Sequence, residues 1–168
     1  MSDLIIYFSH TGENYMNDGI KNIDKGNTEI VAEYIKEYTN GILFKVEPIN
    51  DYPYNYKECC NKAKLELDEN ERPKLKKYIK SIREYNTIYV GGPVWYGTYP
   101  MPIFSILDSL DLNGVTIKPF TTHEGSGLGN VIRDLKRLYP ESLISDGLDI
   151  RGSSAINARE RIEKWCDK

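Results

Sequence analysis

Apolar residues along the chain gather in short continuous runs that alternate with longer, more polar segments. The runs Leu4–Phe8 and Thr87–Gly91 are typical of strands that are covered on both faces of a sheet. Shorter and more polar runs at Leu43–Glu47 and Leu143–Ser145 fit edge strands. Another run, Thr116–Thr121, contains a proline, which lacks a backbone donor and indicates a bulge or an unpaired position. The pattern predicts a sheet with two exposed edges.

Between these runs, apolar residues recur at helical spacing. In Thr28–Ile35 they share one face of the predicted helix, and Asn27 or Thr28 can cap its start. The other predicted helices are Tyr54–Leu67, Leu75–Ile82, Pro102–Leu110, Gly129–Leu138 and Ala158–Trp165. Because strands and helices alternate, the predicted class is α/β with a largely parallel sheet, in a single domain that spans residues 1–168.

Composition and charge exclude several classes of protein. Hydrophobic residues make up 40% and charged residues 28% of the 168 residues, a globular balance. No stretch approaches the roughly 20 apolar residues that span a membrane. The acidic start Met1–Asp3 does not resemble a signal peptide, so we expect a cytoplasmic protein. A net charge of −3 with well-mixed signs argues against a nucleic-acid partner.

The three cysteines, Cys59, Cys60 and Cys166, have no metal-like spacing. We therefore expect structural thiols and no metal site, and we favour this interpretation over a redox role for the adjacent pair. No cysteine or elbow serine lies in the three loops described next, which disfavours triad hydrolysis and leaves no candidate catalytic nucleophile.

The first candidate site follows the first predicted strand, where hydroxyl, glycine and amide groups form a potential anion site. The next helix does not begin at once. An insertion at about residues 15–26 separates the two halves of this loop, in a connection that usually has about two to six residues. Its two ends can still meet and share one phosphate, although ordinary turn and cap roles remain open. The candidate residues are Ser9, His10, Thr11, Gly12, Asn14, Asn27 and Thr28.

The second candidate site follows the strand at Thr87–Gly91. Glycines and prolines stiffen this loop, and Trp95, Tyr96 and Tyr99 are expected in exposed positions that suit stacking on a flat ring. Packing of these aromatics into the core is the alternative. The candidate residues are Pro93, Val94, Trp95, Tyr96, Gly97 and Thr98.

The third candidate site is a glycine-rich loop after Thr116–Thr121. Its glycines let the backbone approach a ligand closely. His123 beside Glu124 raises the question of proton transfer, but we favour a His123 that hydrogen-bonds backbone and closes the loop. The candidate residues are His123, Glu124, Gly125, Ser126 and Gly129.

All three loops follow strands, so in a parallel sheet they emerge at the same, carboxyl edge, where open α/β sheets bind ligands. An anion-binding loop, an aromatic loop and a glycine-rich loop together suit a phosphorylated planar cofactor, and FMN fits this description. The phosphate would lie at the first loop and the isoalloxazine between the other two.

The segments Tyr7–Gly12, Gly26–Thr28, Gly92–Gly97 and Thr122–Gly129 resemble the flavodoxin family, and in particular its bacterial flavodoxin-like branch with Trp-Tyr-Gly and Thr-His-Glu-Gly-Ser-Gly loops. The resemblance extends to Gly147–Gly152. It implies a three-layer sandwich, a five-stranded parallel sheet of order 2-1-3-4-5 with helices on both faces, and non-covalent FMN. It also implies that backbone near Gly97 contacts the flavin nitrogen that is protonated on reduction.

The resemblance further implies an electron-transfer protein that works with redox partner proteins. The alternative is an NAD(P)H-dependent FMN oxidoreductase that acts on quinones, flavins or nitro compounds. Two aromatics in the second loop leave little room for such a substrate, which favours the carrier. The mild net charge departs from the strong acidity of electron-carrier flavodoxins, so the usual ferredoxin-like docking is not expected.

Overall fold

A parallel sheet of order β4-β1-β5-β6-β7 forms the centre of the computed structural model, which describes all residues from Met1 to Lys168. The strand β8 also pairs with β6, further along the same edge as β7. Together β7 and β8 make one interrupted fifth strand, so the predicted order 2-1-3-4-5 is confirmed. The strands are β1 Ser2–Tyr7, β4 Ile42–Lys45, β5 Tyr85–Pro93, β6 Thr116–His123, β7 Leu143–Ile144 and β8 Leu148–Arg151.

The interruption of the fifth strand lies opposite the proline of β6. β7 pairs with the start of β6, β8 pairs with β6 from Phe120 onward, and Lys118 and Pro119 have no partner between them. On its other side Pro119 stays in register with Val90 of β5. Because proline cannot donate to the ladder, the unpaired position predicted from the sequence falls on this side of β6.

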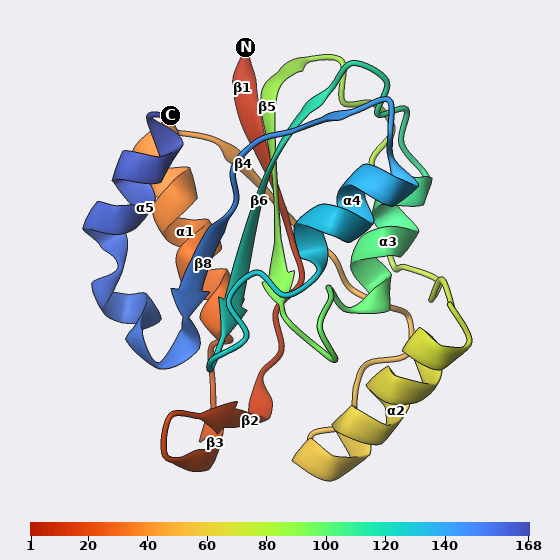
Figure 1. Ribbon diagram of the computed structural model, residues 1–168, viewed down its shortest axis with the longest axis vertical. Coiled ribbons are helices and arrows are strands. Elements are labelled where there is room, and N and C mark those ends of the chain that lie inside the picture. Colours follow the sequence, from red (N-terminus) through yellow and green to blue (C-terminus); the bar gives the residue numbers. More distant parts are fainter.

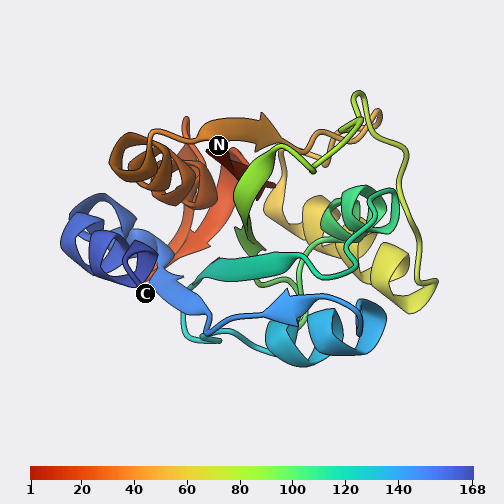
Figure 2. The ribbon, with the colours of Figure 1, turned by 90° about the horizontal axis from the view of Figure 1, so that it is seen from above.

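Helices cover both faces of the sheet and complete the predicted three-layer sandwich (Figures 1 and 2). α1 (Asn27–Thr39), α5 (Arg159–Cys166) and the short 3₁₀ helix η1 (Gly152–Asn157) cover one face; α3 (Met101–Asp108) and α4 (Val131–Leu138) cover the other. Side chains alternate along β1, so Ile5 packs into the cluster with α1 and α5, whereas Leu4 and Ile6 pack toward α3 and α4. No helix of the chain is both long and apolar enough to cross a membrane.

The chain between β4 and β5 departs from the prediction. α2 (Tyr56–Asp68) lies beyond the carboxyl ends of the strands (Figure 1). The helix predicted at Leu75–Ile82 is wrong, because this segment is irregular. Its start is hydrogen-bonded to the chain after β4 instead of forming a helix: Lys76 N donates to Glu47 O at 2.9 Å, and Ile49 N donates at 2.8 Å to Lys74 O, just before the segment. Leu75 and Ile82 are its buried anchors in the core.

The predicted insertion forms an antiparallel hairpin of β2 (Gly12–Met16) and β3 (Gly19–Ile23). It begins three residues before the expected boundary, because Gly12 already pairs with Ile23. The hairpin projects from the carboxyl edge of the sheet (Figure 1), and Glu13 of β2 joins it to the start of α2. The candidate site therefore has two walls that stand outside the sheet.

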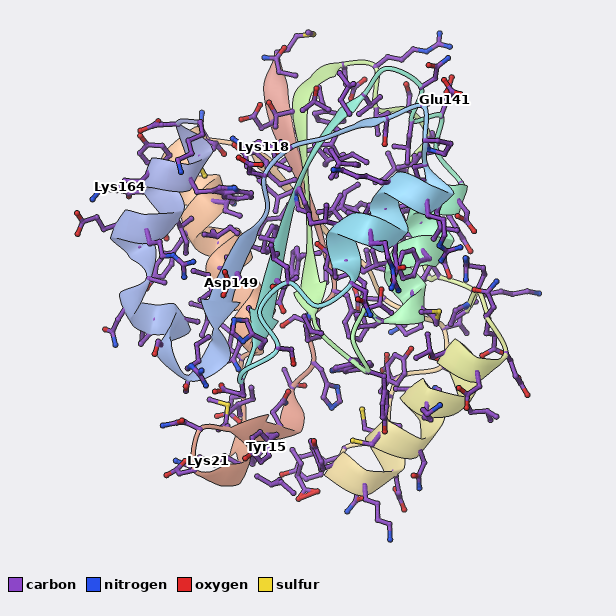
Figure 3. All side chains as sticks on the ribbon, viewed as in Figure 1. Tyr15, Lys21, Lys118, Glu141, Asp149 and Lys164 are labelled. Carbon is purple, nitrogen blue, oxygen red and sulfur yellow. The ribbon has the colours of Figure 1, made fainter.

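Lys118 fastens the C-terminal helix to the sheet. Its side chain is 8% exposed, and its ammonium donates at 3.2 Å to the carbonyl oxygens of both Trp165 and Cys166 at the end of α5. The ammonium also lies 5.2 Å from the ring centre of Trp165. Figure 3 shows Lys118 at the sheet, whereas Lys164 of α5 points outward.

We expect Lys118→Met to lower the free energy of unfolding by about 1–3 kcal/mol, because one buried and one partly buried carbonyl at the end of α5 lose a charged donor. Urea denaturation measures this change. Lys164→Met is the matched control, since that lysine is exposed and pairs only with Glu160 of its own helix, and it should change stability little. Equal effects of the two substitutions would contradict the role assigned to Lys118.

Candidate functional site

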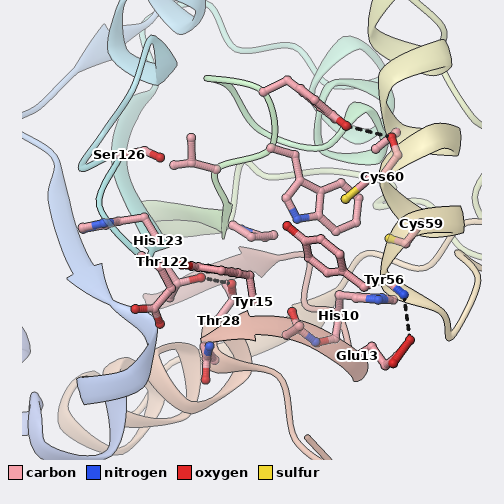
Figure 4. Close-up of a pocket in the computed structure, with 18 residues that line it drawn as sticks. His10, Glu13, Tyr15, Thr28, Tyr56, Cys59, Cys60, Thr122, His123 and Ser126 are labelled. Carbon is pink, nitrogen blue, oxygen red and sulfur yellow. Dashed lines mark hydrogen bonds between the residues drawn. The ribbon is translucent and has the colours of Figure 1, made fainter. Parts of the chain in front are cut away.

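A cavity of about 380 Å³ opens at the carboxyl edge of the sheet. Its walls come from the loops that follow β1, β5 and β6, from the hairpin β2–β3 and from α2 (Figure 4). Its volume falls within the range of about 300–1,000 Å³ that is typical of small-molecule sites. The convergence predicted from strand order is therefore found, with two additional walls.

The predicted site residues divide into those that line the cavity and those that do not. The lining residues are His10, Asn14, Asn27, Thr28, Pro93, Val94, Trp95, Tyr96, His123, Glu124 and Ser126. The residues that do not line it are Ser9, Thr11, Gly12, Gly97, Thr98, Gly125 and Gly129. Several of this second group instead fix the shape of the loops.

The two ends of the insertion meet, as the sequence allowed. Gly26 packs so closely on Ser9 that an added Cβ would collide with the Ser9 hydroxyl. The expected cap of α1 by Asn27 or Thr28 is wrong, because Gly26 occupies the N-cap position and no side chain makes a capping hydrogen bond there. Ser9 Oγ accepts the amide hydrogen of Glu29 at 3.1 Å instead, because the first half-loop folds back onto the helix start.

Two contacts bind the three loops to one another. The hydroxyls of Thr28 and Thr122 are 2.7 Å apart in a buried hydrogen bond. Asn130 N donates to Gly97 O at 2.6 Å, and Gly129 has a φ of 50° with no room for a Cβ beside that carbonyl. The Gly97 carbonyl is therefore engaged within the protein, which leaves other backbone groups of this loop to meet a ligand.

The three aromatics of the second loop have three different environments. Trp95 is half-buried and packs edge-to-face on Tyr52 and Phe8, with ring centres 5.0 and 5.3 Å away. Tyr96 is 51% exposed, and its hydroxyl donates to Cys60 O of α2 at 3.2 Å. The expected exposure of Tyr99 is wrong, because its ring is fully buried in the core and its hydroxyl lies 2.8 Å from two strand carbonyls.

His10 carries an unpartnered polar atom in the cavity wall. Its Nε2 is buried and makes no hydrogen bond, while its ring packs on Trp95 with centres 5.7 Å apart. Burial lowers the pKa of His10, so the imidazole is neutral at pH 7. A buried ring nitrogen without a partner costs free energy unless a bound group supplies one.

His123 and Glu124 are both engaged by the protein. His123 Nδ1 accepts the Gly125 amide hydrogen at 2.9 Å, so Nε2 carries the proton and donates to Asp149 at 2.9 Å. His123 therefore closes its loop, the role that we favoured over proton transfer. Glu124 accepts from the Ser153 amide at 2.7 Å and lies 3.7 Å from Arg151, which offsets its charge beside the cavity.

Sequence reasoning missed the wall of the cavity that α2 forms and part of the wall that the hairpin forms. The missed lining residues are Glu13, Tyr15, Tyr56, Cys59, Cys60, Ala63 and Thr122. Those of α2 fall at positions i, i+3, i+4 and i+7, a single helix face whose pattern was available in the sequence. What the pattern could not show is that α2 lies beyond the sheet edge. Burial raises the pKa of Cys59 to about 12, which fits a structural thiol.

Asp149, the partner of His123, makes the stability of the fold depend on pH. Burial by itself would raise its pKa, but the hydrogen bond from His123 and the guanidinium of Arg161 outweigh burial and hold the pKa below the ordinary 3.8. A depressed pKa stabilises the fold above pH 3.8, and this contribution disappears as pH falls through the folded-state value. We expect Asp149→Asn to be less stable than the unmodified protein at pH 7, with the difference shrinking in urea titrations toward pH 3. A difference that is constant over this range would show that charge is not its cause.

Comparison with known proteins agrees with this geometry. A family model described as Flavodoxin matches residues 20–168. The match begins within the hairpin, so the loop after β1 lies outside it. No curated protein matches the chain in sequence.

Solved structures resemble the chain over nearly its whole length. A protein from Bacteroides uniformis ATCC 8492 assigned to the flavoproteins is 27% identical, with a TM-score of 0.80 over 99% of this chain and 98% of its own. A second, from Bacteroides eggerthii DSM 20697, is 25% identical, with a TM-score of 0.79 over 99% and 96%. A flavoprotein from Lactobacillus acidophilus NCFM, solved in complex with FMN, is 18% identical and shares the fold with a TM-score of 0.66 over 95% and 98%. The matched family model covers most of the chain and shows that it belongs to the flavodoxin family.

Proposed function

We propose that the cavity binds FMN non-covalently and that the protein transfers electrons between redox partner proteins through this cofactor. The observation that carries the proposal is the meeting of three strand-following loops around one cavity with an unpartnered imidazole nitrogen in its wall. Family membership supports it, as does the FMN complex of the Lactobacillus acidophilus protein with the same fold.

The donor set at the start of α1 suits a phosphate. Asn27 is the first residue of this helix, and its side chain lines the cavity, where the positive end of the helix dipole favours an anion. Gly26 leaves no space for a side chain beside Ser9, so the two half-loops form one compact cradle. Of the residues predicted to hold the phosphate, Asn14, Asn27 and Thr28 line the cavity and would contact it, whereas Ser9, Thr11 and Gly12 would shape the loop around it.

The other two loops would hold the flavin ring between Pro93–Thr98 and His123–Gly129. Trp95 supplies a rigid apolar wall, because Phe8 and Tyr52 fix its ring from behind and exclude water there. Neutral His10 offers one hydrogen-bonding atom to the bound group. A bound flavin supplies the redox chemistry, while these side chains bind and orient it.

The contact between Tyr96 and α2 favours an electron carrier over an enzyme with a second substrate. The hydroxyl of Tyr96 donates to Cys60 O and so bridges the aromatic loop and the helix wall. This bridge narrows the space beside the proposed ring site, where a nicotinamide or a quinone would have to stack. Redox partner proteins need only reach an edge of the cofactor.

Substituting Asn27 tests the phosphate position. We expect Asn27→Asp to weaken FMN binding about tenfold or more, because a second negative charge then faces the phosphate. Riboflavin, which lacks the phosphate, should bind the variant and the unmodified protein alike. Fluorescence titration of the apoprotein with both flavins measures the two affinities. An aspartate is compatible with the first turn of a helix, so folding should persist.

Asn22→Asp is the matched control, because Asn22 is exposed on β3 and does not line the cavity. It should leave both affinities unchanged. If neither flavin binds to the unmodified protein, the proposed cofactor is wrong. If Asn27→Asp weakens FMN and riboflavin equally, the phosphate does not lie at the start of α1.

Mixing with reduced nicotinamides separates the carrier from the enzyme. We expect the visible absorbance of the FMN-loaded protein to persist after anaerobic mixing with NADH or NADPH, and to bleach when the chemical reductant dithionite is added. Stopped-flow absorbance at the flavin band follows the reaction. Rapid bleaching by either nicotinamide alone would favour the NAD(P)H-dependent oxidoreductase.

A further inference from the structure

The hairpin β2–β3 begins and ends at the two half-loops that form the proposed phosphate cradle. The chain leaves the cradle at Gly12 and returns at Gly26, which packs against Ser9 so tightly that an added Cβ would also lie only 2.9 Å from the His10 carbonyl oxygen. Both ends of the hairpin are therefore fixed at the place where the phosphate is expected. Any group that the hairpin carries toward the cavity reaches a ligand whose phosphate is held at its base.

The base of the hairpin is tied to both neighbouring walls. Glu13 N donates to Tyr54 O at 3.2 Å, and Glu13 Oε1 accepts from the Tyr56 amide at the start of α2 at 2.9 Å. Asn14 Nδ2 donates to the His10 carbonyl at 3.0 Å. An isolated two-stranded hairpin is marginally stable at best, so these ties hold β2 in place. The last of these ties is made by Asn14, and together they fix the position of the adjacent Tyr15 over the cavity.

Tyr15 presents an uncovered aromatic ring to the cavity. Its side chain lines the cavity and is 52% exposed, and Figure 4 shows it reaching in from the hairpin. Its cross-strand partner Ile20 has the same exposure on the same face of the hairpin but lies outside the cavity. Covering an aromatic ring gains free energy in proportion to the apolar area removed from water, so a ligand in the cavity gains affinity by packing on Tyr15.

We propose that the hairpin is part of the cofactor site and that the ring of Tyr15 packs directly on the bound FMN. This inference rests on the proposed function and adds a contact from the hairpin, at a residue that belongs to none of the three loop motifs. The same contact would add to the ties at the base of the hairpin when the cofactor is bound, so FMN should further slow the exchange of the hairpin amides. Ile20 provides a matched position, since it shares the strand pair, the face and the exposure of Tyr15.

Binding measurements on three variants test the contact. We expect Tyr15→Ala to weaken FMN binding about tenfold, because the ring's apolar contact is lost. Tyr15→Phe should stay within about twofold of the unmodified protein, since it keeps the ring. Ile20→Ala should bind as the unmodified protein does. Thermal unfolding of each apoprotein checks that the variants are folded before titration.

Amide hydrogen exchange across residues 13–23 supplies a readout that does not depend on affinity. At saturating FMN, exchange in the hairpin should slow in the unmodified protein and in Ile20→Ala, but not in Tyr15→Ala. If FMN binds the unmodified protein and Tyr15→Ala alike, this inference fails while the proposed function stands. Equal weakening by Tyr15→Ala and Ile20→Ala, or by Tyr15→Ala and Tyr15→Phe, would also overturn it. No FMN binding by the unmodified protein would defeat the proposed function itself.

Discussion

Parallel pairing of β1, β5 and β6 forces the chain to turn at the same edge of the sheet after each of these strands. The cavity depends on this constraint, because its three loops are far apart in the sequence and meet only through the sheet. The buried hydrogen bond between Thr28 and Thr122 ties the first helix to the end of β6 at that edge. The rest of the site is arranged around this junction, which sets the distance between the cradle at α1 and the glycine-rich loop.

The sequence predicted the parts of the fold that follow from periodicity and turn chemistry. The runs at Leu4–Phe8 and Thr87–Gly91 became β1 and β5, and the proline of β6 lies where a ladder bond is missing. The helix predicted at Leu75–Ile82 failed because its backbone bonds to the chain after β4, a long-range choice that local spacing does not encode. Tyr99 was misplaced for a related reason, since only the folded chain brings two strand carbonyls to its hydroxyl.

The candidate site was predicted in its loops and missed in its outer walls. Residues such as Asn27, Trp95 and His123 follow strands or begin helices, so topology alone directs them to the carboxyl edge. Tyr15 and Tyr56 line the cavity for a different reason. Glu13 of the hairpin accepts a hydrogen bond from the start of α2, which lies 43 residues further along the chain. Glu13 ties these two segments together through its carboxylate and its backbone amide, and no local sequence pattern predicts either bond.

The claim that FMN binds among these three loops is tested most directly by two-dimensional NMR titration of isotope-labelled protein with FMN. Binding at the carboxyl edge predicts saturation at one FMN per chain. It also predicts shift changes concentrated in residues 9–15, 26–28, 93–98 and 123–129, with little change around Lys118 at the far side of the sheet. An absence of shift changes, or changes centred on Lys118 and the end of α5, would contradict it.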